Sequence, residues 1–235
     1  MSRRQPRRQS TPAGNTLFIP DPHAPYHHRG MFRFLREVKA EFDPSRVVFL
    51  GDVIDGLTAS RYSPQAAAKG ADDEFKAACD TIRRLAAMFP LADVVVGNHD
   101  LRVEKKASEH GIPAVRIRPL NEVPDLIEPL RSWRWHEKLK LNRSTLATHG
   151  DGLGGANPGE AAVLQHRCNV VMGHLHTRFG VTYFSRGDWR NWAMNCGCLV
   201  DANSPAANYA KHHVKRPIYG VGLLLRGEIP LTIPM

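Results

Sequence analysis

Three short runs of apolar residues, separated by two segments with helical periodicity, constrain how the first hundred residues can fold. The runs are Thr16–Ile19, Val47–Leu50 and Val94–Val96. Between them, apolar residues recur at helical spacing over 30–42 and 72–89, which predicts two amphipathic helices. Strands that alternate with helices in this way pair in parallel through right-handed crossovers. We therefore expect an α/β fold whose first three strands end at the same edge of one sheet.

A short polar block follows each of these runs, and two further blocks follow apolar runs in the second half. The five blocks are Asp21-Pro22-His23, Gly51-Asp52-Val53-Ile54-Asp55, Gly97-Asn98-His99-Asp100, Thr148-His149-Gly150-Asp151 and Gly173-His174-Leu175-His176. Loops at strand ends are where catalytic groups collect. A single block has simpler explanations; Asp100, for example, is a candidate cap for a helix that begins near residue 101. Five blocks in order, with five of the twelve histidines, indicate a shared site.

The side chains in these blocks are those of a divalent metal site. Carboxylate, imidazole and amide ligands together indicate a hard-to-borderline cation. Asp52 directly follows a buried run and Gly51 lets the backbone come close, so Asp52 is our candidate for a ligand shared by two metals. The other candidate ligands are Asp21, His23, Asn98, His149, His174 and His176. Two such cations lower the pKa of bound water toward ~7, so a metal-bridging hydroxide is the expected nucleophile for phosphoester hydrolysis.

His99 is the candidate general acid. If Asn98 binds metal, the side chain that follows it is expected to point toward the substrate, where it can protonate the leaving oxygen. We expect Asp55 to hydrogen-bond to His99 and to keep its ring protonated. The predicted catalytic pair is therefore His99 and Asp55.

The second half of the chain is predicted to be richer in strands. Strands are expected over 144–148, 169–172, 180–185, 192–199, 218–225 and 229–233, with helices over 101–110 and 159–167. Residues 111–143 contain four prolines and are predicted to be irregular. We expect a single domain over 16–235, in which the later strands build a second sheet. A flexible basic arm over 1–15 precedes it.

The charge of the chain bears on its partners. The formal net charge is +9, and the body stays basic when the four arginines of the arm are set aside. A basic protein suits an acidic substrate such as nucleic acid, although excess charge also serves solubility alone. The arm itself either contacts a phosphate backbone or is simply solvated. We expect a phosphoester substrate, with nucleic acid as one class, and no membrane partner; the sequence leaves the oligomeric state open.

The cysteine count and the hydropathy bear on the compartment. The four cysteines are too few for a secreted disulfide framework, and a reducing cytoplasmic location fits best. No apolar run approaches the ~18 residues of a membrane span. At 42% hydrophobic residues the chain can build a sizeable core, so extensive disorder is not expected.

Taken together, the five blocks resemble the signature of the calcineurin-like metallophosphoesterases, which reads D-x-H, G-D-x-x-D, G-N-H-[DE], H and G-H-x-H. The resemblance implies a four-layer αββα sandwich with two central mixed β-sheets. It also implies roles for the metal ligands and for the catalytic pair. One metal would take Asp21, His23, Asp52 and His176, the other would take Asp52, Asn98, His149 and His174, and His99 would be the acid paired with Asp55. Two divalent ions are implied, with manganese as the first expectation and iron, zinc, nickel, cobalt or magnesium as alternatives.

Two positions depart from the protein serine/threonine phosphatase branch of that family. That branch has an arginine where Gly56 stands and prefers glutamate where Asp100 stands. Gly-Asn-His-Asp is shared by repair nucleases and many phosphodiesterases, and the compact size resembles small microbial or phage-encoded members. We therefore favour a phosphodiesterase acting on nucleic acid or a nucleotide. The alternatives are a phosphomonoesterase or protein phosphatase, and a non-catalytic member that uses the same scaffold for binding.

A few residues near the blocks have two interpretations. Arg61, Arg102 and Arg178 are candidates to hold phosphate oxygens, although bracing a nearby loop explains Arg102 better. Trp189 and Trp192 are candidates to stack on bases, with core packing as the stronger interpretation.

Overall fold

The computed structural model describes residues 14–60, 70–210 and 216–235 of the 235-residue chain. The first half contains β1 (Thr16–Ile19), α1 (Met31–Phe42), β2 (Arg46–Phe49), η1 (Leu57–Ala59), α2 (Ala71–Met88), β3 (Ala92–Val95), α3 (Arg102–Glu109), η2 (Ala114–Arg116) and η3 (Leu120–Glu122). Then follow α4 (Pro124–Leu130), β4 (Trp133–His136), β5 (Lys138–Lys140), β6 (Thr145–Thr148), α5 (Pro158–His166), β7 (Asn169–Met172), β8 (Phe179–Arg186), β9 (Trp189–Cys196), η4 (Pro205–Ala210), β10 (Gly220–Leu225) and β11 (Ile229–Pro234).

The first sheet has six strands in the order β11-β10-β1-β2-β3-β4. β1, β2 and β3 are parallel neighbours, as the sequence predicts, and β4 extends the parallel set. β10 runs antiparallel to β1, and β11 runs antiparallel to β10. The prediction that all later strands form the second sheet was therefore wrong for β10 and β11. β10 is buried along almost its whole length, so it suits a sheet that is covered on both faces.

The second sheet has five strands in the order β5-β6-β7-β9-β8. β6, β7 and β9 are parallel, while β5 and β8 pair antiparallel at the two edges. Both sheets are thus mixed. The loops that carry the polar blocks follow parallel strands, namely β1, β2 and β3 of the first sheet and β6 and β7 of the second.

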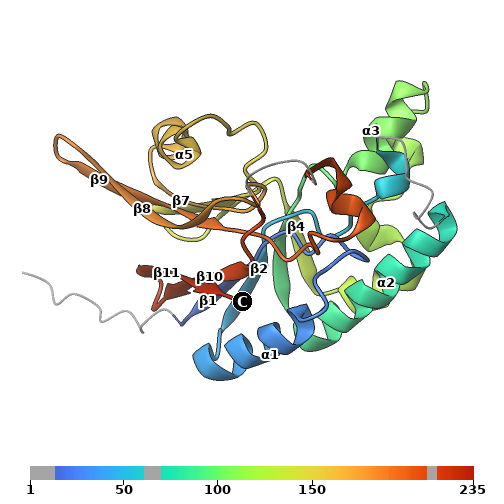
Figure 1. The fold of residues 1–235 in the computed structure, drawn as a ribbon, viewed down its shortest axis with the longest axis horizontal. Helices are drawn as coiled ribbons and strands as arrows, with labels where there is room; N and C mark the ends of the chain where they lie inside the picture. Colours follow the sequence, from blue (N-terminus) through green and yellow to red (C-terminus); the bar gives the residue numbers. More distant parts are fainter. Residues whose placement is uncertain (1–13, 61–69, 211–215) are drawn as a thin grey trace, which may run out of the picture.

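The molecule is built in four layers (Figure 1). α1 and α2 cover the outer face of the first sheet, the second sheet packs on its inner face, and α5 lies on the far face of the second sheet. Each of the three interfaces has its own apolar cluster. Leu35, Ile82 and Phe49 belong to the first cluster, Phe18, Val48 and Met194 to the second, and Val163 and Val170 to the third. This is the fold class that the resemblance implied.

Residues 111–143, predicted to be irregular, contain α4, β4 and β5. Pro124 lies in the first turn of α4, where a missing N–H is tolerated. Trp133 anchors β4, since it is 5% exposed, stacks on Phe49 at 4.5 Å and donates its indole N–H to the carbonyl of Phe89 at 2.9 Å. Tertiary contacts, rather than a periodic pattern, therefore hold this strand in place.

The predicted basic arm over 1–15 lies outside the described residues except for its last two. Of these, Asn15 already belongs to the fold, because its amide donates to the Phe42 carbonyl at 2.6 Å and its side-chain oxygen accepts from the Arg226 N–H at 3.1 Å. Within the described part of the chain, no helix is both long and apolar enough to span a bilayer.

Candidate metal centre

The loops after five parallel strands meet at one end of the two sheets. β1, β2 and β3 of the first sheet lead to Asp21, Asp52 and Asn98, and β6 and β7 of the second lead to His149 and His174. Backbone bonds tie the first two loops together, from the His23 N–H to the Asp52 carbonyl at 2.9 Å and from the Asp55 N–H to the Ala24 carbonyl at 2.9 Å. Packing of the two sheets on a common core then brings residues that are 153 positions apart, such as His23 and His176, into contact.

One cluster joins Asp21, His23 and His176, whose ligand atoms lie within 4.8 Å of one another. The Nε2 atoms of His23 and His176 are 3.3 Å apart, and His176 Nε2 is 3.5 Å from Asp21 Oδ1. Donor atoms bound about 2.1 Å from one cation lie roughly 3.0–3.4 Å apart in octahedral or tetrahedral geometry. These separations suit a single divalent ion.

A second cluster joins Asp52, His149 and His174. His149 Nε2 lies 3.1 Å from His174 Nδ1, 3.4 Å from Asp52 Oδ2 and 3.0 Å from Asn98 Oδ1. Four donor atoms therefore converge at spacings that suit another cation. All seven predicted metal ligands thus fall into two adjacent groups.

Asp52 lies between the two groups. Its Oδ2 is 3.4 Å from His149 Nε2 in one cluster and 3.6 Å from His23 Nε2 in the other. Its other oxygen, Oδ1, accepts the backbone N–H of His99 at 2.8 Å. One oxygen of Asp52 is therefore fixed by the fold, and the other faces both clusters.

Strained backbone is concentrated at these ligands. Asp21, His23, Asp52 and His174 have positive φ angles of 45°, 49°, 48° and 61°. This left-handed conformation is uncommon for residues other than glycine and costs on the order of 1–3 kcal/mol each. Such strain persists only where surrounding structure imposes it, and here it turns four ligand side chains toward one point.

Three glycines of the blocks make room for the ligands. A Cβ atom on Gly97 would overlap Asp52 Oδ1, one on Gly173 would overlap Asp21 Oδ2, and one on Gly51 would lie 2.6 Å from His149 Nδ1. The glycines of the pattern are thus required by close approach as well as by turns.

Further contacts orient the ligand rings. Asp55 Oδ2 lies 2.8 Å from His23 Nδ1, and the Leu50 carbonyl lies 2.7 Å from His149 Nδ1. With Nδ1 donating to these oxygens, each ring directs its Nε2 atom to the centre, which is the usual orientation of a metal-binding histidine. Asp21 is held in turn by the His174 N–H, which lies 3.1 and 3.0 Å from its two carboxylate oxygens.

His99 and Asp55 lie beside the clusters. His99 Nδ1 is 3.4 Å from Asp55 Oδ2, a longer separation than the one between Asp55 and His23, and no described residue forms a hydrogen bond with this nitrogen. His99 Nε2 lies 3.8 Å from Asp52 Oδ2 and 2.7 Å from Arg102 Nη2. Asp55 therefore serves mainly His23 and Arg102, and the sequence analysis did not foresee this sharing.

Asp100 joins the second and third blocks. Its Oδ1 accepts the N–H groups of Val53 at 2.9 Å and Ile54 at 3.2 Å, and its Oδ2 accepts the N–H of Gly97 at 2.8 Å. The helix that follows has no side-chain cap. The interpretation of Asp100 as a helix cap is therefore wrong, because the carboxylate is used to fix the two ligand loops.

The charges of the centre depend strongly on one another. Burial works against charge on Asp52, yet the neighbouring His149 and other imidazoles hold the pKa of Asp52 well below its usual range. Burial also opposes protonation of His149, but Asp52 raises the pKa of this ring to about 10. Burial and the nearby His99 lower the pKa of His23, which keeps that ring in the neutral form that binds metal. Burial and Asp52 raise the pKa of Asp100 to about 7.

One supporting residue was named in the sequence analysis without its partners, and another was missed. Arg102, a candidate to hold phosphate oxygens or to brace a loop, contacts both members of the catalytic pair, Asp55 and His99. Glu74 of α2 is 3% exposed and accepts the N–H groups of Leu57 at 2.6 Å and Thr58 at 3.0 Å, which fixes the chain after the second block. Nothing in the sequence distinguishes Glu74 from an ordinary acidic residue in the first turn of a helix.

The other candidates make contacts of their own or lie outside the described residues. Arg178 donates to the Ala156 carbonyl at 3.1 Å. Trp192 is 7% exposed within the core between the sheets, and Trp189 packs on the cluster beneath α5, which confirms the packing interpretation for both. Arg61 lies outside the described residues.

Comparison with known proteins identifies the family. The calcineurin-like phosphoesterase model matches residues 14–202, which covers all five blocks. The chain belongs to the calcineurin-like phosphoesterase family. This membership supports a phosphoesterase hydrolase in general and agrees with the ligand clusters. No curated protein matches the chain.

Several solved structures are similar to the phosphoesterase chain at low identity. YfcE, a phosphoesterase from E. coli, has 16% identity and a TM-score of 0.45, with 94% of this chain and 98% of that chain covered. Vacuolar protein sorting 29 from Cryptosporidium parvum has 15% identity and a TM-score of 0.45, with 94% and 96% covered. The Pseudomonas putida nuclease MPE has 12% identity and a TM-score of 0.41, with 93% and 87% covered. Identities this low transfer neither substrate nor partner.

Proposed function

We propose that this phosphoesterase is a dinuclear-metal-dependent hydrolase that prefers phosphodiesters of nucleic acids or nucleotides. The observation that carries the proposal is the position of Asp52 Oδ2, 3.4 Å from His149 Nε2 and 3.6 Å from His23 Nε2. These two rings belong to different clusters, and a carboxylate oxygen between them is what a pair of cations ~3.5–4 Å apart requires.

The nitrogen and oxygen ligand atoms of the two clusters fit such a pair, and so do the three glycines that leave room for the ligand side chains. Asp21, His23 and His176 would hold one cation, Asn98, His149 and His174 would hold the other, and Asp52 would be shared. When bound, the cations would supply Lewis acidity and would lower the pKa of water, so that hydroxide is available to attack phosphorus at neutral pH. Manganese is our first expectation for the metal.

The residues of the chain perform the remaining work. Asp55 and the Leu50 carbonyl keep the Nε2 atoms of His23 and His149 directed at the centre. His99 Nε2, 3.8 Å from Asp52 Oδ2, is within reach of a phosphoester held there, and it would protonate the leaving oxygen. Asp55 Oδ2 lies on the other side of the His99 ring, 3.4 Å from Nδ1, and would help to orient it.

The preference for diesters rests on charge and on the second block. A net charge of +9 suits a polyanionic substrate. Gly56 has a φ of 64°, a left-handed conformation that residues other than glycine rarely adopt. This local structure disfavours the arginine that protein phosphatases place at the position of Gly56, which supports a different substrate class.

The test compares two chromogenic substrates on one protein. Protein stripped of metal by chelation is reloaded with manganese and assayed with bis-p-nitrophenyl phosphate and with p-nitrophenyl phosphate. The proposal predicts that diester cleavage dominates and disappears on chelation. Dominant monoester cleavage would move the function to a phosphomonoesterase, and bound metal without any turnover would indicate a non-catalytic member.

A matched pair of variants assigns the activity to the centre. Asp52 and Asp93 are both 1% exposed and both lie in the first sheet or directly after one of its strands, but Asp93 bonds to Arg46, Arg134 and His136 instead of the histidine clusters. Asp52→Asn is expected to abolish turnover and lower the bound manganese, while Asp93→Asn keeps both and loses only stability. Equal activity in the two variants would refute the role of Asp52.

A further inference from the structure

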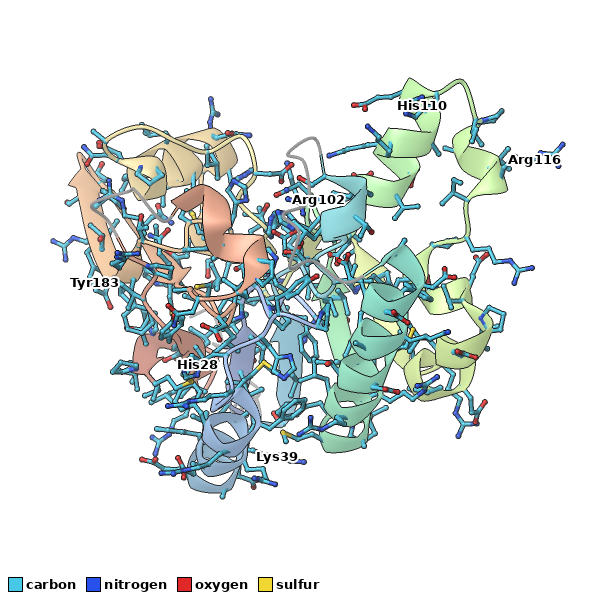
Figure 2. The ribbon with its side chains drawn as sticks, turned by 45° about the vertical axis from the view of Figure 1, so that its right-hand side comes forward. His28, Lys39, Arg102, His110, Arg116 and Tyr183 are labelled. Atoms are coloured by element: carbon cyan, nitrogen blue, oxygen red, sulfur yellow. The ribbon has the colours of Figure 1, made fainter. Side chains whose placement is uncertain are left out.

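Arg102 is held from one side by the second metal block. It is the first residue of α3, its side chain is 21% exposed, and it lies in the crowded middle of the molecule, whereas Arg116 and Tyr183 point away at opposite rims (Figure 2). Its Nη1 donates to the Asp55 backbone carbonyl and to Asp55 Oδ1, both at 3.0 Å. These two contacts fix the plane of the guanidinium group.

The other end of the guanidinium faces the reacting centre. Nη2 lies 2.7 Å from His99 Nε2, and that nitrogen lies 3.8 Å from Asp52 Oδ2, the oxygen between the two clusters. Nη2 carries two hydrogens, and His99 is its only acceptor within the described ranges. Two groups that can both donate to an anion thus meet at one point beside the candidate metal centre.

We propose that Arg102 binds the phosphoryl group of the substrate, with one phosphoryl oxygen in the place where Arg102 Nη2 and His99 Nε2 now meet. Guanidinium groups bind phosphate oxygens through short, charge-assisted hydrogen bonds, and a phosphate oxygen is a stronger acceptor than an imidazole nitrogen. Accepting from Nη2, the oxygen separates Arg102 from His99, and His99 Nε2 then faces the leaving oxygen. The identity of the anion as substrate rests on the proposed function.

The second block both positions Arg102 and balances its charge. Gly56 follows Asp55 directly, and the Arg102 side chain passes over it, 3.7 Å from the position of a Cβ atom. Asp55 balances the charge of Arg102 while no anion is present, and it holds the guanidinium in place so that little conformational entropy is lost on binding. If Arg102 only held the loop of the second block in place, its contacts with Asp55 would be sufficient. The approach of Nη2 to His99 would add nothing to that role.

The experiment measures binding of inorganic phosphate to the manganese-loaded protein by isothermal titration calorimetry, with kcat and KM for bis-p-nitrophenyl phosphate as the second readout. Arg102→Ala is expected to weaken phosphate binding by about 10- to 100-fold, the loss typical of a charge-assisted hydrogen bond. Arg102→Gln keeps a donor for Asp55 and loses the charge, so it is expected to behave in the same way. Arg102→Lys keeps a point charge and is expected to recover part of the affinity.

Arg46→Ala is the matched control. Arg46 is also partly buried, with 31% of its side chain exposed, and also bonds to a buried aspartate, Asp93, at 2.9 Å, but it lies at the start of β2, away from the metal blocks. It is expected to lower the melting temperature about as much as Arg102→Ala and to leave phosphate affinity unchanged. Manganese content is measured in every variant and is expected to stay at the wild-type level.

The outcomes separate the inference from the proposed function. Unchanged phosphate affinity in both Arg102→Ala and Arg102→Gln would overturn the inference and leave Arg102 as a brace, as would a loss of manganese that accounts for the weaker binding. If Arg102→Ala does not fold, Arg102→Gln decides. A wild-type protein that binds phosphate through Arg102 yet hydrolyses no phosphoester would refute the proposed function alone.

Discussion

Gly173→Ala is the substitution whose effect the structure specifies most closely. Gly173 precedes His174 in the fifth block, and it does not have a positive φ, so alanine meets no backbone penalty there. The new Cβ atom would lie 3.3 Å from Leu50 Cβ and would overlap Asp21 Oδ2. The Asp21 oxygen is by far the nearer atom, so the Asp21 carboxylate is the group that must retreat, by about 1 Å.

The magnitude follows from what Asp21 holds. Its two oxygens accept the His174 N–H at 3.1 and 3.0 Å, and Oδ1 faces His176 Nε2 at 3.5 Å. A displaced carboxylate leaves this partly buried N–H poorly paired, which costs about 1 kcal/mol of the free energy of unfolding. It also misplaces a metal ligand, and we expect manganese affinity at that cluster to fall by at least about 10- to 100-fold, the loss typical of disturbing even an orienting contact.

The assay is a calorimetric manganese titration of chelated protein, together with urea unfolding of the metal-free form. Gly154→Ala is the control, because a Cβ atom there meets no atom within 4 Å and its φ is not positive. The reasoning is wrong if Gly173→Ala binds two manganese ions with the affinity of the control.

The remaining predictions concern other parts of the same centre. His99→Ala should lower kcat by ~10²–10⁴ while the manganese content stays constant, and full activity in this variant would remove His99 from catalysis. Asp100→Asn should lower the free energy of unfolding by about 1–3 kcal/mol, measured in urea, because an amide lacks one of the acceptors used by Gly97, Val53 and Ile54; unchanged stability would contradict this. His149, with its pKa raised from 6.5 to about 10 by Asp52 against the effect of burial, carries a proton that a cation must displace. Manganese affinity should therefore rise by about tenfold per pH unit between pH 7 and 9, and a flat profile would contradict the assignment of His149. If nucleic acid is the substrate, its affinity should fall steeply as salt rises, and salt-independent binding would exclude recognition of the backbone.

The same raised pKa sets the pH dependence of the metal-free fold. The ion pair of His149 with Asp52 contributes stability that is fully present below the unfolded pKa of 6.5, and this contribution is lost as the pH rises through the folded value of about 10. The metal-free protein should thus lose stability over the range in which its metal affinity increases.

The parts of the fold that the sequence predicted are those with a strong local pattern. Val47–Leu50 and the apolar stripe of 72–89 have lengths and periods that only a buried strand and an amphipathic helix satisfy. β4 has four residues within a proline-rich segment, and its place depends on the contacts of Trp133 with Phe49 and Phe89. β10 lies within a predicted strand, but its antiparallel pairing with β1 depends on which sheet has an open edge beside it. A local sequence pattern carries no information on that.

For the site, the order of the blocks after apolar runs predicted which side chains come together, because strand direction fixes where a parallel strand ends. The finer contacts did not follow. Asp55 was assigned to His99, yet it lies closer to His23, and its second oxygen accepts from Arg102. Such sharing depends on ångström-scale positions of loops in three-dimensional contact, and sequence spacing carries no information on that scale.

The central claim is that one oxygen of Asp52 is shared by two cations. Crystals grown with excess manganese and measured at the manganese absorption edge test it directly. Two anomalous peaks are expected ~3.5–4 Å apart, with Asp52 in contact with both and His23 and His149 on opposite sides. A single peak, or two peaks that do not both contact Asp52, would contradict it.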